Sequence, residues 1–396
     1  MSSETRVQIS RESLAAPGSE AARIENVKHL ASYSWIESPV PTIAVPGIPP
    51  RWAPPTVPFR LPKDSGLVYI AQNAARHPES PLEPLFRSLY VTNPGFDIRP
   101  VDIITDRNNI RKLLSFINPS SSRNRLEVFT IIAEVVDGTM LMCRTETKTS
   151  EIIAPHEFKG YGHEFEKAYT RRQLKGSTGY HRIISYHFGG LNFVLRHEVD
   201  GYVSQSETSK VIQKEAETDG LSGLLGSLSL SAVNTTSPQP RSSTPSESKM
   251  IIREEGIVVP IDSTLEIKTC TSRRRLHIRE IAPQLWVSQT PKLVRAYHSR
   301  GLFQDAKVED VAKEIKTWEL ANQENLRKLV ALVKAIFDAV KAWGGKAIIR
   351  YDEGSDSIIV TSEVSAERLL PEDLYLKWDD NEEKTAADQT EVSASS

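Results

Sequence analysis

Two stretches of alternating hydrophobic and polar residues predict β-hairpins in the first half of the chain. Residues 128–144 alternate on both sides of the Asp-Gly pair at 137–138, which favours the tight turn between antiparallel strands. Residues 183–203 alternate in the same way around the Gly-Gly pair at 189–190. Residues 257–269 are also rich in β-branched side chains, so the chain is expected to form a sheet that includes both halves of the sequence.

Hydrophobic residues recur at helical spacing in two other segments. Residues 325–343 place seven hydrophobic side chains on one face, and two glycines then end the run. A shorter helix is predicted after Asp106, a suitable N-cap. Its Arg107, Arg111 and Lys112 either form a solvated face or touch phosphates. Strands and helices together predict an α+β fold, with a mixed sheet flanked by helices.

Composition divides the chain into a core and several polar or proline-rich segments. The expected order is a disordered N-terminal tail (1–35), a proline-rich extended strap (36–65), the first half of the core (66–203), a largely disordered Ser/Thr-rich insertion (204–249), the second half of the core (250–378) and an acidic disordered tail (379–396).

The overall composition limits the possible environments of the protein. Its 396 residues carry a formal charge of −2, so any contact with nucleic acid must come from a local basic patch. Two cysteines provide neither a zinc set nor a disulfide framework. No apolar run is long enough to span a bilayer and no secretory signal is present, so we expect no membrane contact and a nuclear or cytoplasmic location.

Two short acidic motifs suggest a metal-dependent hydrolase. Glu198-Val199-Asp200 and Glu266-Ile267-Lys268 each alternate along a strand-like segment, so the charged residues of each motif share one face. If the two strands pair, three carboxylates and one ammonium group converge. Such a cluster suits Mg²⁺ or Mn²⁺, which take oxygen ligands. The alternative is an ordinary solvated strand face.

A third acidic residue precedes these motifs. Gly162-His163-Glu164-Phe165-Glu166 begins a short amphipathic helix in which Phe165 and Tyr169 fall on one face. A buried Phe165 would direct Glu166 into the same cleft. An exposed helix glutamate remains the alternative.

The order of these motifs resembles the decapping exoribonuclease family, which includes the fungal partner of the nuclear 5′-to-3′ exonuclease. The resemblance rests on Gly-x-x-Phe-Glu ending at Glu166, on Glu198-Val199-Asp200 and on Glu266-Ile267-Lys268, and it continues to Gln284 and the strand after Pro291. It covers roughly residues 155–360 and implies a nuclease core of the PD-(D/E)xK type. Pro283 departs from the family's active-site helix.

The resemblance implies a role for each matching residue. Glu166, Asp200, Glu266, Lys268 and Gln284 would form the catalytic group. The metal ligands would be Glu166, Glu198, Asp200, Glu266 and the backbone carbonyl of Ile267. The run of basic residues directly after the lysine motif, Arg273, Arg274 and Arg275, either meets the RNA backbone or forms a solvated helix start.

We therefore expect a Mg²⁺- or Mn²⁺-dependent hydrolase that acts on RNA 5′ ends. The family resemblance implies removal of incomplete or non-canonical caps, release of 5′ pyrophosphate and 5′-to-3′ degradation. It also implies a 5′-to-3′ exoribonuclease as a partner. The alternative is a catalytically weak nuclease-fold protein that binds RNA ends or stabilises a partner exonuclease.

Overall fold

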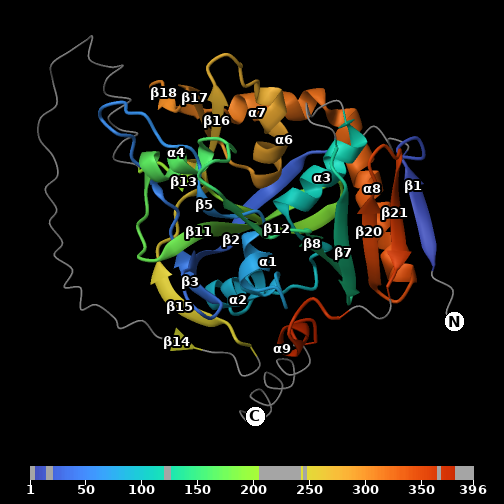
Figure 1. Ribbon diagram of the computed structural model, residues 1–396. Coiled ribbons are helices and arrows are strands. Elements are labelled where there is room, and N and C mark those ends of the chain that lie inside the picture. Colours follow the sequence, from blue (N-terminus) through green and yellow to red (C-terminus); the bar gives the residue numbers. More distant parts are fainter. Residues whose placement is uncertain are drawn as a thin grey trace, which may run out of the picture.

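The computed structural model describes residues 5–14, 21–119, 126–204, 242–243, 248–363 and 367–379, with the backbone only at 242–243. A mixed sheet of twelve strands runs through these residues (Figure 1). From one edge to the other its strands are β1 (Arg6–Ser10), β21 (Ser357–Ser362), β20 (Lys346–Tyr351), β7 (Phe129–Val136), β8 (Thr139–Thr145), β6 (Ile103–Asp106), β12 (Leu191–Glu198), β11 (Ser177–Phe188), β2 (Ile24–Ile36), β3 (Thr42–Gly47), β15 (Ile251–Gly256) and β14 (Ser242–Ser243).

Two smaller sheets lie beside the large one in the described part of the chain. The first contains β10 (Thr170–Arg171), β4 (Arg51–Trp52), β13 (Gly201–Tyr202), β16 (Thr264–Thr271), β17 (Lys292–Ser299) and β18 (Leu302–Phe303), with β19 (Val308–Asp310) paired to β17. The second contains β5 (Gly66–Tyr69) and β9 (Ser150–Ile153). Strand β16 carries the lysine motif, as the β-prone sequence around it predicted.

Helices cover both faces of the large sheet. The helical segments are α1 (Gln72–Arg76), α2 (Glu83–Thr92), α3 (Arg107–Ile117), α4 (Gly162–Tyr169), the 3₁₀ turn η2 (Ile261–Ser263), α6 (Ile278–Ser288), α7 (Ala312–Ala321), α8 (Gln323–Ala342) and α9 (Glu372–Tyr375). Helices α3, α6 and α8 share one hydrophobic cluster with the sheet, and α2 and α9 share another. Of the described helices, not one is both long and apolar enough to cross a membrane.

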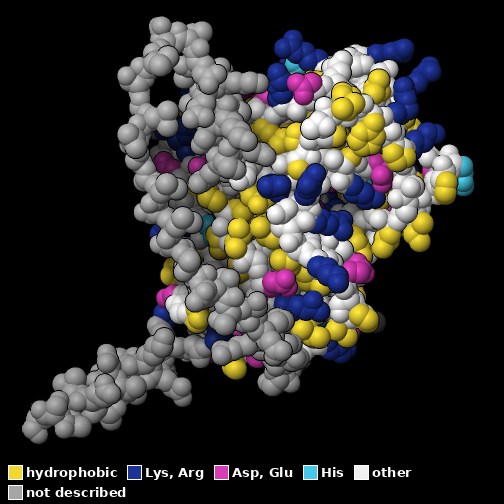
Figure 2. Space-filling model, turned by 90° about the vertical axis from the view of Figure 1, so that its left-hand side faces the viewer, with side chains coloured by type: hydrophobic (Ala, Val, Ile, Leu, Met, Phe, Trp, Pro, Cys, Tyr) yellow, Lys and Arg dark blue, Asp and Glu magenta, His cyan; other side chains and the backbone are white. Residues whose placement is uncertain are grey.

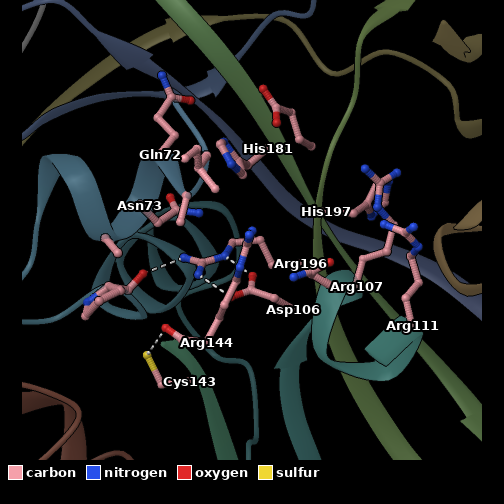
Figure 3. Close-up of a pocket in the computed structure, with 16 residues that line it drawn as sticks. Gln72, Asn73, Asp106, Arg107, Arg111, Cys143, Arg144, His181, Arg196 and His197 are labelled. Atoms are coloured by element: carbon pink, nitrogen blue, oxygen red, sulfur yellow. Dashed lines mark hydrogen bonds and ion pairs between the residues drawn. The ribbon is translucent and has the colours of Figure 1, made fainter. Parts of the chain in front are cut away.

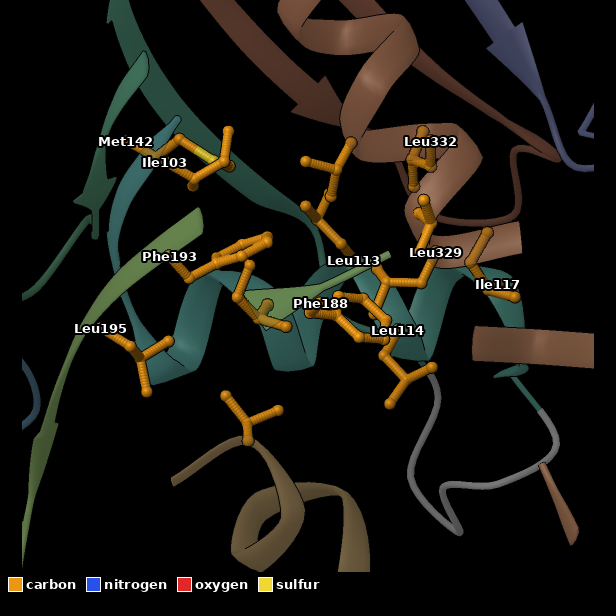
Figure 4. Packing of buried hydrophobic residues seen from close by; sticks show 14 of the residues in the cluster. Ile103, Leu113, Leu114, Ile117, Met142, Phe188, Phe193, Leu195, Leu329 and Leu332 are labelled. Atoms are coloured by element: carbon orange, nitrogen blue, oxygen red, sulfur yellow. The ribbon is translucent and has the colours of Figure 1, made fainter. Parts of the chain in front are cut away.

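The larger hydrophobic cluster fixes helix α3 against the sheet. Figure 4 shows Leu113 and Leu114 of α3 among Phe193 and Leu195 of β12 and residues of α8. Leu113 and Leu195 are completely buried. Burial of an aliphatic side chain of this size stabilises the fold by roughly 1.5–3 kcal/mol. The cluster therefore holds the N-terminal end of α3, with its arginines, beside the end of β12.

Both predicted hairpins are confirmed. Strands β7 and β8 pair antiparallel across Asp137 (φ 43°) and Gly138 (φ 87°), the positive φ values that a tight hairpin turn requires. Strands β11 and β12 pair across Gly189 and Gly190, which also have positive φ. A Cβ atom on Gly189 would lie 2.2 Å from the Val330 side chain, so close packing on α8 adds a second requirement for glycine.

The predicted disordered tail over residues 1–35 is wrong. Residues 6–10 form β1, which pairs with β21, and residues 24–36 form β2, which pairs with both β11 and β3. Strand β2 buries Tyr33 and Trp35 completely. The polar composition of this segment hid both strands, and their partners β21 and β11 lie far away in the chain, where local patterns carry no information.

The remaining predicted segments and the predicted N-cap can also be compared with the structure. The strap at 36–65 contains the extended segments β3 and β4, each paired in a sheet. Asp106 does occupy the N-cap position of α3, but its side chain makes no capping hydrogen bond, because Arg196 takes both carboxylate oxygens. The predicted insertion at 204–249 and the tail at 379–396 lie almost entirely outside the described residues.

Candidate active site

The candidate site residues come from two helices, two strands and the segment that joins β12 to β13. Glu166 lies on α4, Glu198 ends β12, and Asp200 lies in the turn that leads to β13. Glu266 and Lys268 project from one face of β16, and Gln284 lies on α6. Hydrogen bonds join Asp200 to the backbone of β16, and both Lys268 and Gln284 to Glu266. Glu166 and Glu198 lie close enough to these charged groups for their pKa values to be affected.

Helix α4 is fixed by aromatic packing, as its amphipathic pattern predicted. Phe165 is fully buried, and its ring stacks on Tyr169 with centroids 3.9 Å apart. The ring of Phe303 also packs against Phe165, with centroids 4.5 Å apart. Because consecutive helix residues point in different directions, burial of Phe165 leaves the half-buried Glu166 facing a cavity.

Asp200 connects the two acidic motifs directly. The Ile267 backbone N–H donates a hydrogen bond of 2.7 Å to Asp200 Oδ2. The expected pairing of the two motif strands is wrong in one respect, because β12 belongs to the large sheet and it is β13 that pairs with β16. The chain leaves one sheet at Glu198 and joins the other at Gly201, and Asp200 lies at this crossing.

Glu266 is the centre of a hydrogen-bonded ion-pair group. Lys268 Nζ donates to Glu266 Oε1 at 2.6 Å, and Gln284 Nε2 donates to the same oxygen. Arg107 donates to the other oxygen, Oε2, at 2.9 Å. Burial alone would raise the pKa of Glu266, but Lys268 and Arg107 outweigh it and lower that pKa to about 2.

The other three carboxyl groups have raised pKa values. Burial and the neighbouring carboxylates, Asp200 first among them, raise the pKa of Glu166 well above its usual value. Burial and Glu266 raise the pKa of Asp200 to about 8. The Glu198 side chain is exposed at the cavity, and the protein atoms around its carboxyl group raise its pKa by partial loss of solvation, which Arg107 opposes and Glu266 assists. These acids are crowded, so their ionised forms repel one another unless a cation intervenes.

The donor set fits a divalent cation chemically, since Mg²⁺ and Mn²⁺ prefer several carboxylate oxygens. The pKa values of Glu166, Glu198 and Asp200 are raised, in part by the neighbouring carboxylates, so a bound cation would stabilise their ionised forms. In the part of the chain that is described, however, no three His, Cys, Asp or Glu side chains are spaced to hold a metal ion. Both oxygens of Glu266 already accept hydrogen bonds from Arg107, Lys268 and Gln284. Metal binding therefore requires a rearrangement of these contacts.

Two cavities meet at this cluster of acids. The larger one, about 560 Å³, is lined by Glu166, Glu198 and Asp200 and also by Tyr69 and Tyr180. The smaller one, about 300 Å³, lies along the start of α3 and the end of β12 (Figure 3). Glu198 and Gln72 line both cavities. An extended ligand at the cluster would thus reach into two compartments.

Two groups of basic residues were candidates for contact with phosphates, and one of them lines a cavity. Arg273, Arg274 and Arg275 are exposed, Arg274 pairs with Glu280 at 2.6 Å, and these arginines are not among the residues lining the two cavities. Their contact with RNA stays a prediction. The arginines that line the smaller cavity come from α3, β8 and β12. Arg107 and Arg111 of α3 were among the predicted candidates, whereas no short motif marks Arg144 or Arg196.

Comparisons with known proteins agree with this architecture. A family model described as "Domain of unknown function (DUF8563)" matches residues 9–378. A search of curated proteins found no match. Forty-two chains among the solved structures match.

Three solved structures illustrate the likeness. Scheffersomyces stipitis Rai1, in complex with (3′-NADP)⁺ and calcium ion, has a TM-score of 0.58 and 11% identity, over 96% of this chain and 99% of that chain. Candida albicans Rai1, in complex with pU5-Mn²⁺, has a TM-score of 0.56 and 14% identity, over 91% and 96%. K. lactis Dxo1, in complex with manganese, has a TM-score of 0.54 and 10% identity, over 92% and 100%. At identities this low the structural likeness establishes a shared fold and no more. The predicted α+β fold, with a mixed sheet flanked by helices, is confirmed.

Proposed function

Because the chain belongs to the family described as a domain of unknown function (DUF8563), we propose its activity from its own site: divalent-metal-dependent hydrolysis at the 5′ end of RNA. One observation carries the proposal. Glu166, Glu198 and Asp200, all with raised pKa values, face the Glu266–Lys268 pair where two cavities meet. A fixed group of acids is unfavourable without a cation and has no evident structural purpose.

The ligands of proteins with the same fold support a nucleotide substrate. Candida albicans Rai1 was solved with pU5 and Mn²⁺, and Scheffersomyces stipitis Rai1 with (3′-NADP)⁺ and calcium. These ligands combine phosphates with nucleosides and divalent ions. The two cavities of this protein, with tyrosines in one and arginines in the other, suit such a ligand.

Each residue of the site has a role in this proposal. Glu166, Glu198, Asp200 and Glu266, with the Ile267 carbonyl, would hold one or two Mg²⁺ or Mn²⁺ ions, whose chemistry is to lower the pKa of water and to neutralise phosphate charge. Lys268 supplies a positive charge at the acids and keeps the Glu266 carboxylate oriented. Gln284, held on the buried side of α6, places an amide N–H beside the same carboxylate. That amide would position water or a phosphate oxygen.

A second candidate function is RNA-end binding without efficient catalysis. The specific observation is that Arg107 and Lys268 both form ion pairs with Glu266 and so neutralise its charge. A protein in which these contacts persisted would hold an RNA end or stabilise a partner exonuclease. Metal binding separates the two functions, because only the hydrolase needs it.

The experiment compares RNAs with different 5′ ends. Purified protein is incubated with 5′-triphosphate, unmethylated-cap and NAD-capped RNAs in Mg²⁺ or Mn²⁺, beside Glu166→Gln and Asp200→Asn variants. Glu164→Gln is the matched control, since Glu164 lies on the same helix and pairs with Lys167 at 2.7 Å. Cleavage by wild type and control, lost in the two variants, supports the hydrolase and shows which end is preferred.

The absence of cleavage would have two different meanings. If Mn²⁺ binds by calorimetry and the RNAs stay intact, the substrate class is wrong. If neither Mn²⁺ binding nor cleavage occurs, the end-binding function is the better account. A 5′-to-3′ exoribonuclease partner and a nuclear or cytoplasmic location stay predictions of the sequence.

A further inference from the structure

Arg182 is a charged side chain in the interior of the protein. The lysines and arginines visible on the face shown in Figure 2 lie at the surface, where water stabilises their charge. Arg182, on β11, is only 1% exposed. Its Nη2 donates a hydrogen bond of 2.9 Å to the Val259 carbonyl, whereas Nε and Nη1 have no hydrogen-bond partner among the described residues. Buried donors are normally hydrogen-bonded, so these two nitrogens indicate a ligand.

The charge of Arg182 is not balanced by a contacting carboxylate within the described ranges. The neighbouring buried arginine, Arg196, differs in this respect, because it donates to both oxygens of Asp106 at 2.6 and 2.8 Å. Burial lowers the pKa of Arg182, and attraction to Tyr180 and then to Asp262 opposes this without forming an ion pair. Arginine nevertheless keeps its proton in proteins, so a full positive charge stays inside. Water can accept the hydrogen bonds but cannot neutralise this charge, which favours a bound anion.

Two imidazole groups lie beside this guanidinium group on the same face of the sheet. His197 of β12 is directly opposite Arg182 in the antiparallel register. His29 of β2 is opposite Ile184, which lies two residues after Arg182 on β11, and residues two apart on a strand share a face. His197 is 3% exposed, and the ring nitrogens of both histidines have no hydrogen-bond partner among the residues that the structure describes.

The two histidines are close enough to Arg182 to be influenced by its charge. Burial and then Arg182 lower the pKa of His29 to about 4. Burial also lowers the pKa of His197, followed by Arg107 and then Arg182. Both imidazoles are therefore neutral at physiological pH, and a neutral imidazole has one ring N–H to donate. The three side chains together direct hydrogen-bond donors and a positive charge into one buried place.

The surroundings of these donors select a small ligand. Arg182 and His197 have almost no solvent contact, so nothing large fits between them. Ile184 and Leu195, the next residues on the same face, belong to the larger hydrophobic cluster, so the donors lie at the edge of the core. His197 also lines the smaller cavity, which gives a small ion a route from solvent. A monatomic anion accepts charge-assisted hydrogen bonds and needs no space for additional oxygens.

We propose that Arg182, His197 and His29 bind a halide ion, chloride in solution, where β2, β11 and β12 lie side by side. Arg182 donates to the ion from Nε and Nη1, the two nitrogens that the Val259 carbonyl leaves free, and each imidazole donates one ring N–H. The ion neutralises the buried guanidinium group and so stabilises the folded protein. The inference concerns an ion that is not a substrate, so it is independent of the proposed hydrolysis.

The chloride dependence of folding tests the inference. Full-length wild type and Arg182→Met are unfolded with urea in EDTA at about 1 mM and about 100 mM sodium chloride, with sodium gluconate added to keep the ionic strength constant. A site half-filled at about 10 mM chloride raises the folded-to-unfolded ratio of wild type about tenfold between these conditions, because the ion binds only the folded state. In Arg182→Met, which lacks the buried charge, the ratio should change less than about twofold.

Arg350→Met is the matched control, because Arg350 is a strand arginine whose partner, Asp352, lies at the surface. It should respond to chloride as wild type does. Sodium bromide should replace sodium chloride, and sodium phosphate should not. A wild type that does not respond to chloride, or an Arg182→Met protein that responds as strongly as wild type, would overturn the inference.

A second measurement uses wild type alone and therefore does not depend on the folding of a variant. Crystals are grown with sodium bromide in place of chloride, and diffraction is measured at the bromine absorption edge. The expected result is an anomalous peak within hydrogen-bonding reach of Arg182 Nε or Nη1 and of His197. Peaks confined to the surface, with water or a protein carboxylate at Arg182, would show that the site holds no halide. Neither measurement involves RNA, so failure of the proposed hydrolysis leaves the halide site to be decided on its own.

Discussion

The four acids of the candidate site should respond to neutralisation with opposite signs, and Glu266 provides the most informative test. Glu266→Gln removes the charge that holds Lys268 at 2.6 Å and Arg107 at 2.9 Å, while the shape of the side chain is kept. Glu266 is 2% exposed, so two cations would be left without their partner in the protein interior. Breaking a buried ion pair typically costs about 3–5 kcal/mol. Lys268 retains some solvent contact, so we expect a loss of about 3 kcal/mol in the free energy of unfolding.

Asp200→Asn should have the opposite effect in the absence of metal. Asp200 has a pKa raised to about 8, mainly by burial and then by Glu266, so its ionised form is disfavoured in the folded protein. Each pKa unit corresponds to about 1.4 kcal/mol, and the partial exposure of Asp200 reduces the effect to the order of 2 kcal/mol. An asparagine oxygen can still accept the Ile267 N–H. We therefore expect Asp200→Asn to stabilise the metal-free protein.

The sign of the pH dependence follows from the same shift. An aspartate whose folded pKa is raised keeps its proton in the folded state between about pH 4 and pH 8, whereas the unfolded chain loses it. This group therefore lowers the free energy of unfolding as the pH rises across that window, and Asp200→Asn removes that part of the slope.

Urea denaturation in EDTA, followed by circular dichroism at several pH values, measures both variants. A Glu266→Gln protein as stable as wild type, or an Asp200→Asn protein less stable than wild type at pH 7, would refute the electrostatic account of the site. Added Mn²⁺ should stabilise the wild type and have less effect on Asp200→Asn, because metal bound only to the folded state raises the free energy of unfolding.

Three further predictions concern the stability of the fold outside the group of acids. Phe165→Ala should lower the free energy of unfolding by about 3–5 kcal/mol in urea, because a fully buried ring on α4 is lost; a change under 1 kcal/mol would contradict its role as the anchor of that helix. Gly189→Ala should cost about 1–3 kcal/mol, since its φ is +60° and the new Cβ would clash with Val330, whereas Gly190→Ala meets only Lys334 Nζ at 3.7 Å and should cost less; equal losses would rule out the clash. The pKa of His29 is lowered to about 4 by burial and then by Arg182, so stability should fall as the pH drops from 6.5 towards 4, and His29→Gln should flatten this fall in a pH series of urea titrations.

Local patterns were sufficient where a residue's partner is near in sequence. The Asp-Gly turn between β7 and β8, the amphipathic helix α4 and the long helix α8 were all predicted from spacing and turn chemistry. Those features depend on backbone preferences and on residues three or four positions apart. The same reasoning failed for β1, because its partner β21 lies at the other end of the chain, with Arg6 opposite Thr361.

The sequence by itself determined which acids could form a site and on which elements they lie. Alternation on β16 put Glu266 beside Lys268, and the amphipathic pattern of α4 directed Glu166 away from the core. Only the tertiary structure decided which positively charged side chains lie beside those acids. Arg107 reaches Glu266 from 159 positions away, and Arg111 and Arg144 meet at one cavity although they come from a helix and a strand. The physical reason is that electrostatic interaction depends on distance in space, which the packing of α3 against the sheet sets and which no local pattern encodes.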